Sequence, residues 1–133
     1  MKALFTRFAW LGSLLLVLAS AAPAQTDPIP PVGTALANGS SHELAQYLAS
    51  SVDVGFDSDV HNYNATQTEL IIKNFFAKNP VASCKPVADG ASTGGVPYAV
   101  YSYSSRNGNY SVFVRLRSKQ GTPSIEYINI TKQ

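Results

Sequence analysis

Apolar and polar positions alternate in short runs along the second half of the chain, and a period of two residues predicts β-strands. The expected strands cover residues 82–89, 97–105, 109–118 and 124–132. The segments between them contain glycine, at "GASTGG", Asn107-Gly108 and Gln120-Gly121. Such pairs supply the positive φ angles of tight hairpins. The pattern therefore predicts a meander of antiparallel strands.

The first half instead shows apolar residues at helical spacing. A first helix is expected from Pro30-Pro31 to Gly39, because proline suits the first turn of a helix and glycine its end. Ser40 with Glu43 three residues later forms a capping box, which predicts a second helix over residues 41–50. The apolar stripe of this second helix consists of Leu44, Tyr47 and Leu48.

A strand and a third helix complete the expected elements. Residues 51–57 alternate as a strand does. Asn64 as N-cap with Gln67 predicts a helix over residues 65–78, which Asn79-Pro80 ends. Helices first and a strand meander last are typical of an α+β fold, in which N-terminal helices pack on a curved antiparallel sheet.

The hairpin turns fix which side chains share a face of this sheet, because successive strand residues point to opposite faces. Centred on Asn107-Gly108 and Gln120-Gly121, the turns place Tyr101 opposite Val114 and Val114 opposite Tyr127. The face expected to pack on the helices carries Ala99, Tyr101, Tyr103, Val112, Val114, Leu116, Ile125 and Tyr127. The other face is expected to carry Val100, Ser102, Phe113, Arg115, Arg117, Glu126, Ile128 and Ile130, with Arg115 paired to Glu126.

Two candidate surfaces follow from this assignment. Tyrosine combines a large apolar body with a hydroxyl, so inward tyrosines can line a pocket for a small apolar ligand or simply fill the core. The candidate ligand-binding residues are Tyr101, Tyr103, Tyr127, Tyr47 and Asn129. An apolar outer patch beside two arginines is typical of a protein-partner or homodimer surface, unless a loop covers it. The candidate partner residues are Val100, Phe113, Arg115, Arg117, Ile128 and Ile130.

The N-terminal segment changes the interpretation of the charge. Residues 1–24 have the positive start, apolar run and Ala-Pro-Ala end of a secretory signal peptide, so residues 25–31 become an extended leader and residues 32–133 a single domain. Lys2 and Arg7 would leave with the signal peptide, and the ten basic residues would fall to eight against eight acidic ones. We therefore expect an exported protein, periplasmic or extracellular, free of the membrane after cleavage and without nucleic-acid binding.

Acidic residues and a histidine gather in "FDSDVHNYN", residues 56–64. Counted from Asp57 as a calcium loop, the sequence lacks the required glycine at the sixth position and glutamate at the twelfth. With only His61, His42 and Cys84 as soft ligands in the mature chain, a zinc site is not expected either. The stretch is interpreted as turn chemistry before a capped helix, and no metal or cofactor is expected. Cys84 is interpreted as a half-buried thiol.

The segment "ELIIKNFFAKNP", the hairpin strands after it and the terminal "YINITK" resemble an exported bacterial family, domain of unknown function 4783 of the NTF2-like (nuclear transport factor 2-like) group. The resemblance implies a cystatin-like cone with a pocket between helices and sheet, and transfers no catalytic residue. It favours a non-catalytic binding or interaction module. The alternative is a metal-independent pocket enzyme of the isomerase or dehydratase type, in which Asp53 and His61 would perform acid–base chemistry.

Overall fold

The structure is a computed structural model that describes residues 28–92, 94–117 and 123–133. Within these residues the chain forms three α-helices, α1 (Ile29–Asn38), α2 (Ser41–Ala45) and α3 (Ala65–Lys78). It also forms six strands, β1 (Leu48–Phe56), β2 (Asp59–Asn64), β3 (Val81–Ser92), β4 (Val96–Ser105), β5 (Gly108–Arg117) and β6 (Ser124–Lys132). The expected signal peptide, residues 25–27 of the leader and the Gln120-Gly121 turn lie outside the described residues.

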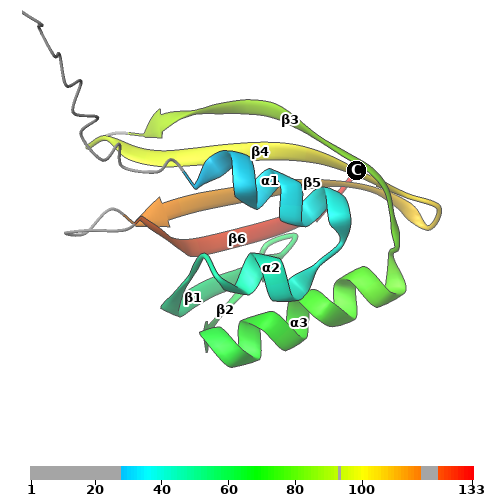
Figure 1. Ribbon diagram of the computed structural model, residues 1–133, viewed down its shortest axis with the longest axis horizontal. Coiled ribbons are helices and arrows are strands. Elements are labelled where there is room, and N and C mark those ends of the chain that lie inside the picture. Colours follow the sequence, from blue (N-terminus) through cyan, green and yellow to red (C-terminus); the bar gives the residue numbers. More distant parts are fainter. Residues whose placement is uncertain (1–27, 93, 118–122) are drawn as a thin grey trace, which may run out of the picture.

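The strands form one curved sheet in the order β2-β1-β6-β5-β4-β3, and the helices lie on one face of it (Figure 1). All neighbouring strands are antiparallel except β1 and β6, which run parallel. Helix α1 packs on β3 and β4, α3 packs on β1 and β2, and α2 joins the two helices. We call the sheet face under the helices the inner face and the opposite one the outer face.

Helix α1 forms where the prolines and glycine predict it. Gly39 adopts a left-handed conformation with φ 63°, and its N–H donates to the Leu36 carbonyl. Val32, Ala35 and Leu36 are buried on one side. The helix begins at Ile29, one residue before the expected start at Pro30-Pro31, so the end of the leader forms its first turn. Proline costs nothing there because first-turn N–H groups have no partner within the helix.

The second helix is much shorter than expected. Ser40 does cap it, accepting from the Glu43 N–H at 3.1 Å, but the Glu43 carboxylate accepts from the Asn38 side chain rather than closing the capping box. The helix ends at Ala45, and the Tyr47 carbonyl accepts a hydrogen bond from the Ile125 N–H at 2.6 Å. The predicted helix over residues 41–50 is wrong because the chain from Leu48 onward forms β1, which pairs with β6.

The acidic stretch is mainly strand rather than turn. Only Asp57 and Ser58 turn the chain, and residues 59–64 form β2 against β1. Asp57 adopts φ 60°, its N–H donates to the Ile130 carbonyl at 2.9 Å, and its carboxylate accepts from the Lys132 N–H at 3.2 Å. The predicted cap of α3 is confirmed, with both halves of the Asn64–Gln67 capping box present. Asp57 therefore anchors the hairpin to β6.

The β4–β5 hairpin is two residues out of the expected register. Its turn is Arg106-Asn107, so Tyr101 lies opposite Val112 rather than Val114. A shift of two residues preserves the face on which each side chain lies, because strand side chains alternate with a period of two. Tyr101, Tyr103, Val112 and Val114 are accordingly all buried on the inner face, as predicted.

The β5–β6 pair contains a β-bulge that the sequence pattern did not reveal. Leu116 pairs with Ile125 as expected, but Arg115 pairs with Tyr127, which leaves Glu126 as an extra residue on β6. Every later β6 side chain is thereby turned to the opposite face. Ile128 and Ile130, expected on the outer face, are buried, with 1% and 3% of their surface exposed. Tyr127 and Asn129, expected inside, lie on the outer face.

Candidate functional site

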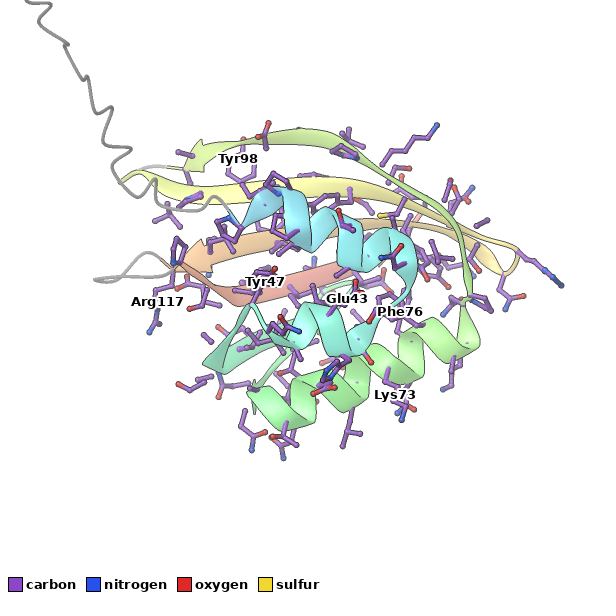
Figure 2. All side chains as sticks on the ribbon, in the orientation of Figure 1. Glu43, Tyr47, Lys73, Phe76, Tyr98 and Arg117 are labelled. Atoms are coloured by element: carbon purple, nitrogen blue, oxygen red, sulfur yellow. The ribbon has the colours of Figure 1, made fainter. Side chains whose placement is uncertain are left out.

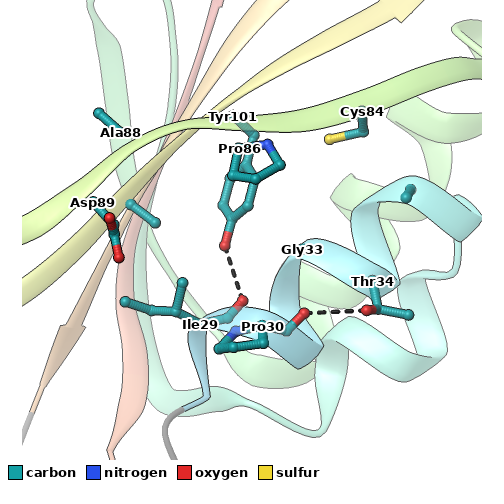
Figure 3. Close-up of a pocket in the computed structure, with 11 residues that line it drawn as sticks. Ile29, Pro30, Gly33, Thr34, Cys84, Pro86, Ala88, Asp89 and Tyr101 are labelled. Carbon is teal, nitrogen blue, oxygen red and sulfur yellow. Dashed lines mark hydrogen bonds between the residues drawn. The ribbon is translucent and has the colours of Figure 1, made fainter.

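An open groove of about 490 Å³ lies between α1 and the strands β3 and β4 (Figure 3). Its lining is largely apolar and includes Pro30, Gly33 and Ala37 from α1 and Cys84, Pro86 and Asp89 from β3. Pro86 and Asp89 are exposed although they line the groove, because β3 is the edge strand and α1 does not cover it fully. The volume lies within the range of small-molecule sites.

Tyr101 and Ala99 form the part of the groove that belongs to β4. The Tyr101 ring is buried, and its hydroxyl donates to the Ile29 carbonyl at 3.0 Å (Figure 3). The ring can approach α1 closely because Gly33 has no side chain. A Cβ placed there would lie 2.9 Å from Tyr101 Cε1. Thr34 likewise donates to the Pro30 carbonyl at 3.1 Å, so both hydroxyl protons point at carbonyl oxygens of α1.

Tyr103 does not reach the groove. It is fully buried, its ring centre lies 5.2 Å from that of Phe75, and its hydroxyl donates to the Asn79 carbonyl. Burial, assisted by the nearby Cys84 and Tyr110 groups, raises the pKa of Tyr103 to about 12. Tyr103 therefore fills the core and holds the C-terminal end of α3 against the sheet.

Cys84 is the free thiol of the described residues, and it lines the groove from β3. Burial raises the pKa of the Cys84 thiol to about 11. A thiol is nucleophilic only as the thiolate, so Cys84 contributes a neutral, weakly polar surface at physiological pH. This agrees with its interpretation as a half-buried side chain.

The other expected lining residues are not brought together with Tyr101. Tyr47 lies beside Glu43 near a small hollow between α1 and α2 (Figure 2). Tyr127 and Asn129 lie on the outer face because of the bulge at Glu126. With its amide nitrogen toward β1, Asn129 donates to the Gly55 and Asp57 carbonyl oxygens at 3.1 and 2.9 Å. The predicted pocket of five residues is thus reduced to Tyr101.

The acid–base pair of the enzyme hypothesis is also separated. Asp53 pairs with Asn62 and His61 with Val54, so Asp53 and His61 point to opposite faces of the sheet. Asp53 accepts a hydrogen bond from the Asn62 amide at 2.8 Å, and His61 lies 2.9 Å from the exposed Asp59 carboxylate. Within the described residues no group of three potential metal ligands lies together. Asp53 and His61 share no cavity.

The outer face carries a continuous aromatic cluster. The rings of Tyr98 and Phe113 stack at 5.7 Å, and Phe113 meets Tyr127 edge to face at 5.8 Å. The Arg115 guanidinium lies over the Tyr127 ring. We define the outer-face patch as Tyr98, Val100, Phe113, Arg115, Arg117 and Tyr127. It retains four of the six predicted partner residues and replaces Ile128 and Ile130, which the bulge buries.

Glu126 closes one end of the outer-face patch. Its carboxylate accepts from Arg115 Nε and from Arg117 Nε, each at 3.0 Å, so the predicted Arg115–Glu126 pair is confirmed. Burial raises the pKa of Glu126, but the hydrogen bonds and charges of Arg117 and Arg115 outweigh burial and hold that pKa below its ordinary value. The three charged groups therefore form a preorganised unit around the bulge.

Helices on the inner face of a curved, mostly antiparallel six-stranded sheet define an NTF2-like fold. An NTF2-like protein of unknown function from Shewanella baltica matches with a TM-score of 0.59 at 12% identity, over 79% of this chain and 87% of that one. The likeness shows the fold alone. No helix in the described residues is long and apolar enough to cross a membrane.

The chain belongs to the family described as Domain of unknown function (DUF4783), whose model matches residues 29–131. A family structure from Bacteroides ovatus matches with a TM-score of 0.74 at 27% identity, over 77% of this chain and 93% of that one. Another, from Bacteroides uniformis, matches with a TM-score of 0.73 at 25% identity, over 78% and 95%. No curated protein gave a significant match.

The groove residues Asp89, Pro86 and Gly33 were not foreseen from the sequence. Asp89 stood in a predicted strand, but its lining role depends on where α1 crosses β3, which no local pattern encodes. Gly33 gave the clearest available signal, because a glycine inside an otherwise apolar helix face often marks a close approach of another group. Here that group is the ring of Tyr101.

Proposed function

We propose that this chain is an exported, non-catalytic binding module that holds a small, mainly apolar molecule in the groove between α1 and β3. The observation that carries the proposal is an apolar groove of about 490 Å³ left open at an edge strand. Export is supported by the secretory pattern of residues 1–24. Binding rather than catalysis is supported by the separation of Asp53 from His61.

Two features of the groove favour ligand binding over simple packing. Pro86 and its neighbours on β3 present apolar surface to the helix side while remaining exposed. Tyr101 is held in place by its bond to Ile29, so the groove is preformed. Preformed apolar concavities lose little entropy when they take up a ligand.

The test is binding of phenylbutanol, a small neutral probe, to the protein purified after any processing by its host. Amide NMR monitors the binding. We expect shifts at Gly33 and Ala99 in the groove. Ala37→Trp places a large ring at the exposed rim of the groove and should abolish these shifts. Thr66→Trp, at an exposed position on α3, is the matched control. Unchanged signals in the groove, or binding that survives Ala37→Trp, would contradict the proposal.

The outer-face patch supports a second candidate function, self-association through the sheet. Its aromatic cluster is only half buried by this chain, and half-exposed aromatic side chains are enriched at protein interfaces. Arg117 and Glu126 place both charge signs beside it, as a self-complementary two-fold contact requires. The partner that we propose for the outer-face patch is therefore a second copy of the chain.

Sedimentation velocity tests the self-association. We expect a concentration-dependent dimer that Phe113→Glu converts to monomer, because the substitution places a charge at the centre of the patch. Ser102→Glu, exposed on the same strand face next to the patch, is the matched control. A protein that is monomeric at every concentration in all three forms would remove this candidate.

A further inference from the structure

We propose that the groove selects a ligand with an apolar body and a positively charged amine, and that the Asp89 carboxylate recognises the amine. The inference rests on the proposed function of the groove and names the class of its ligand. Asp89 lines the groove from β3, opposite the buried Ala99, so its side chain faces the helix side (Figure 3). Its carboxylate makes no hydrogen bond or ion pair with any residue that the structure describes.

The charge of the lining has one sign. Neither lysine nor arginine is among the described residues that line the groove, and the Cys84 thiol is protonated at neutral pH. The Asp89 carboxylate is therefore the charge that an incoming molecule meets. An anionic amphiphile, such as a fatty acid, would approach an unpaired carboxylate, whereas an ammonium group would complement it.

The hydroxyl groups of the lining also favour a cationic ligand over an anionic one. Tyr101 and Thr34 both commit their protons to carbonyl oxygens in the first turn of α1. Neither hydroxyl then offers a donor to a ligand anion. Polar lining atoms that act as acceptors favour a ligand that brings its own donors, and an ammonium group brings three.

The start of α1 offers few N–H groups that could bond the Asp89 carboxylate or an anionic ligand. A carboxylate beside a helix N-terminus is ordinarily satisfied by free N–H groups there, and the same groups ordinarily bind anions. In this chain positions 28, 30 and 31 are all proline, which has no N–H. The first turn is thus poor in donors, both for Asp89 and for an anionic ligand. Asp89 keeps its acceptor capacity for the groove.

The test compares three probes that share a phenyl ring and a butyl chain, namely phenylbutylamine, phenylbutanol and phenylbutyrate. Affinity is measured by NMR titration at low salt, and the site is located by the amide shifts at Gly33 and Ala99, which line the groove. Because Asp89 is exposed, we expect the amine to bind about two- to fivefold more tightly than the alcohol, and the acid to bind more weakly than both. Asp89→Asn should equalise the amine and the alcohol.

The outcomes separate the inference from the function on which it rests. Equal binding of all three probes by the wild type, or an amine preference that persists in Asp89→Asn, overturns the inference and leaves the apolar groove in place. Absence of binding by all three overturns both. Both the inference and the proposed function are supported if Asp89→Asn abolishes the amine preference and raised salt weakens it. Ala37→Trp should then remove the binding of the amine and of the alcohol alike.

Discussion

Arg115 on β5 lies directly opposite Tyr127 on β6, and its guanidinium carbon sits 4.6 Å from the centre of the Tyr127 ring. This pair exists because Glu126 is an extra residue in β6. Without the bulge Tyr127 would face the helices and Ile128 would face outward. One unpaired residue therefore decides which side chains of β6 build the core and which build the outer-face patch.

The bulge predicts opposite tolerance at two neighbouring residues. Ile128→Glu should prevent folding, since an unpaired buried charge costs several kcal/mol, a large part of the roughly 5–15 kcal/mol stability of a typical domain. Tyr127→Glu should cost about 1 kcal/mol or less, because the half-exposed site loses one cation–π contact while the new carboxylate faces Arg115. Far-UV circular dichroism shows whether each variant folds, and urea unfolding of Tyr127→Glu beside the wild type measures its loss of stability. A Tyr127→Glu variant that fails to fold beside a stable Ile128→Glu variant would show that β6 has no bulge.

The two hairpins show how far the sequence could predict the fold. The turn after β4 was placed one position late, yet the resulting two-residue shift in pairing left every face assignment intact. The bulge at Glu126 shifts the pairing by a single residue and reverses Tyr127 and Asn129. The segment "SIEYINI" contains no glycine or proline to mark a bulge. The pairing of β6 with β1 is also irregular at this point, between Leu48–Ile125 and Asp53–Tyr127, and no local sequence pattern encodes such tertiary pairing.

The candidate site was predictable only in part, for a related reason. Tyr101 was correctly placed on the inner face from alternation alone. Tyr47 was assigned to a helix because Ser40 and Glu43 signal a helix start, but the Ile125 N–H draws the Tyr47 carbonyl into the sheet region. Local patterns predict which face a residue occupies, while the crossing of α1 over β3 depends on the packed whole.

A second prediction concerns acid stability and Glu126. The folded pKa of Glu126 lies below its unfolded value, so its stabilising contribution is present above the unfolded pKa and is lost as the pH falls below it. Glu126→Gln should therefore lower the free energy of unfolding at pH 7 by about 1–2 kcal/mol, and this deficit should shrink below about pH 4. Urea unfolding of the variant and the wild type at pH 7 and pH 3 measures this deficit.

The control for Glu126 is Glu43→Gln on α2. Glu43 is an exposed glutamate with a hydrogen bond to Asn38 and no arginine partner in the described residues. Its substitution should change stability by a few tenths of a kcal/mol at pH 7. A Glu126→Gln deficit that is equally large at pH 3 and pH 7 would mean that the two arginines do not stabilise the carboxylate.

A third prediction concerns the contact between Gly33 and Tyr101. Alanine favours a helix interior over glycine by about 1 kcal/mol, but its Cβ would lie 2.9 Å from the Tyr101 ring. Because that ring is buried and bonded to Ile29, we expect overpacking to win and Gly33→Ala to be destabilising by about 1 kcal/mol. In a Tyr101→Leu background the same substitution should become stabilising. Gly33→Ala that stabilises the wild type would show that the ring moves freely.

The last prediction concerns alkaline pH and Tyr103. Its folded pKa, about 12, lies above the unfolded value near 10, so its stabilisation is complete below pH 10 and is lost as the pH rises toward 12. Tyr103→Phe loses the hydrogen bond to Asn79 and should be about 1 kcal/mol less stable at pH 7. Phenylalanine does not ionise, however, so the wild type should lose about 1 kcal/mol more than the variant by pH 11.

Urea unfolding curves of the two proteins should therefore converge between pH 9 and pH 11, whereas Tyr98→Phe on the half-exposed outer face should show no such convergence. Parallel curves for Tyr103→Phe and wild type would mean that the ring ionises in the folded protein as readily as in the unfolded chain, and that α3 is not held by a buried tyrosine.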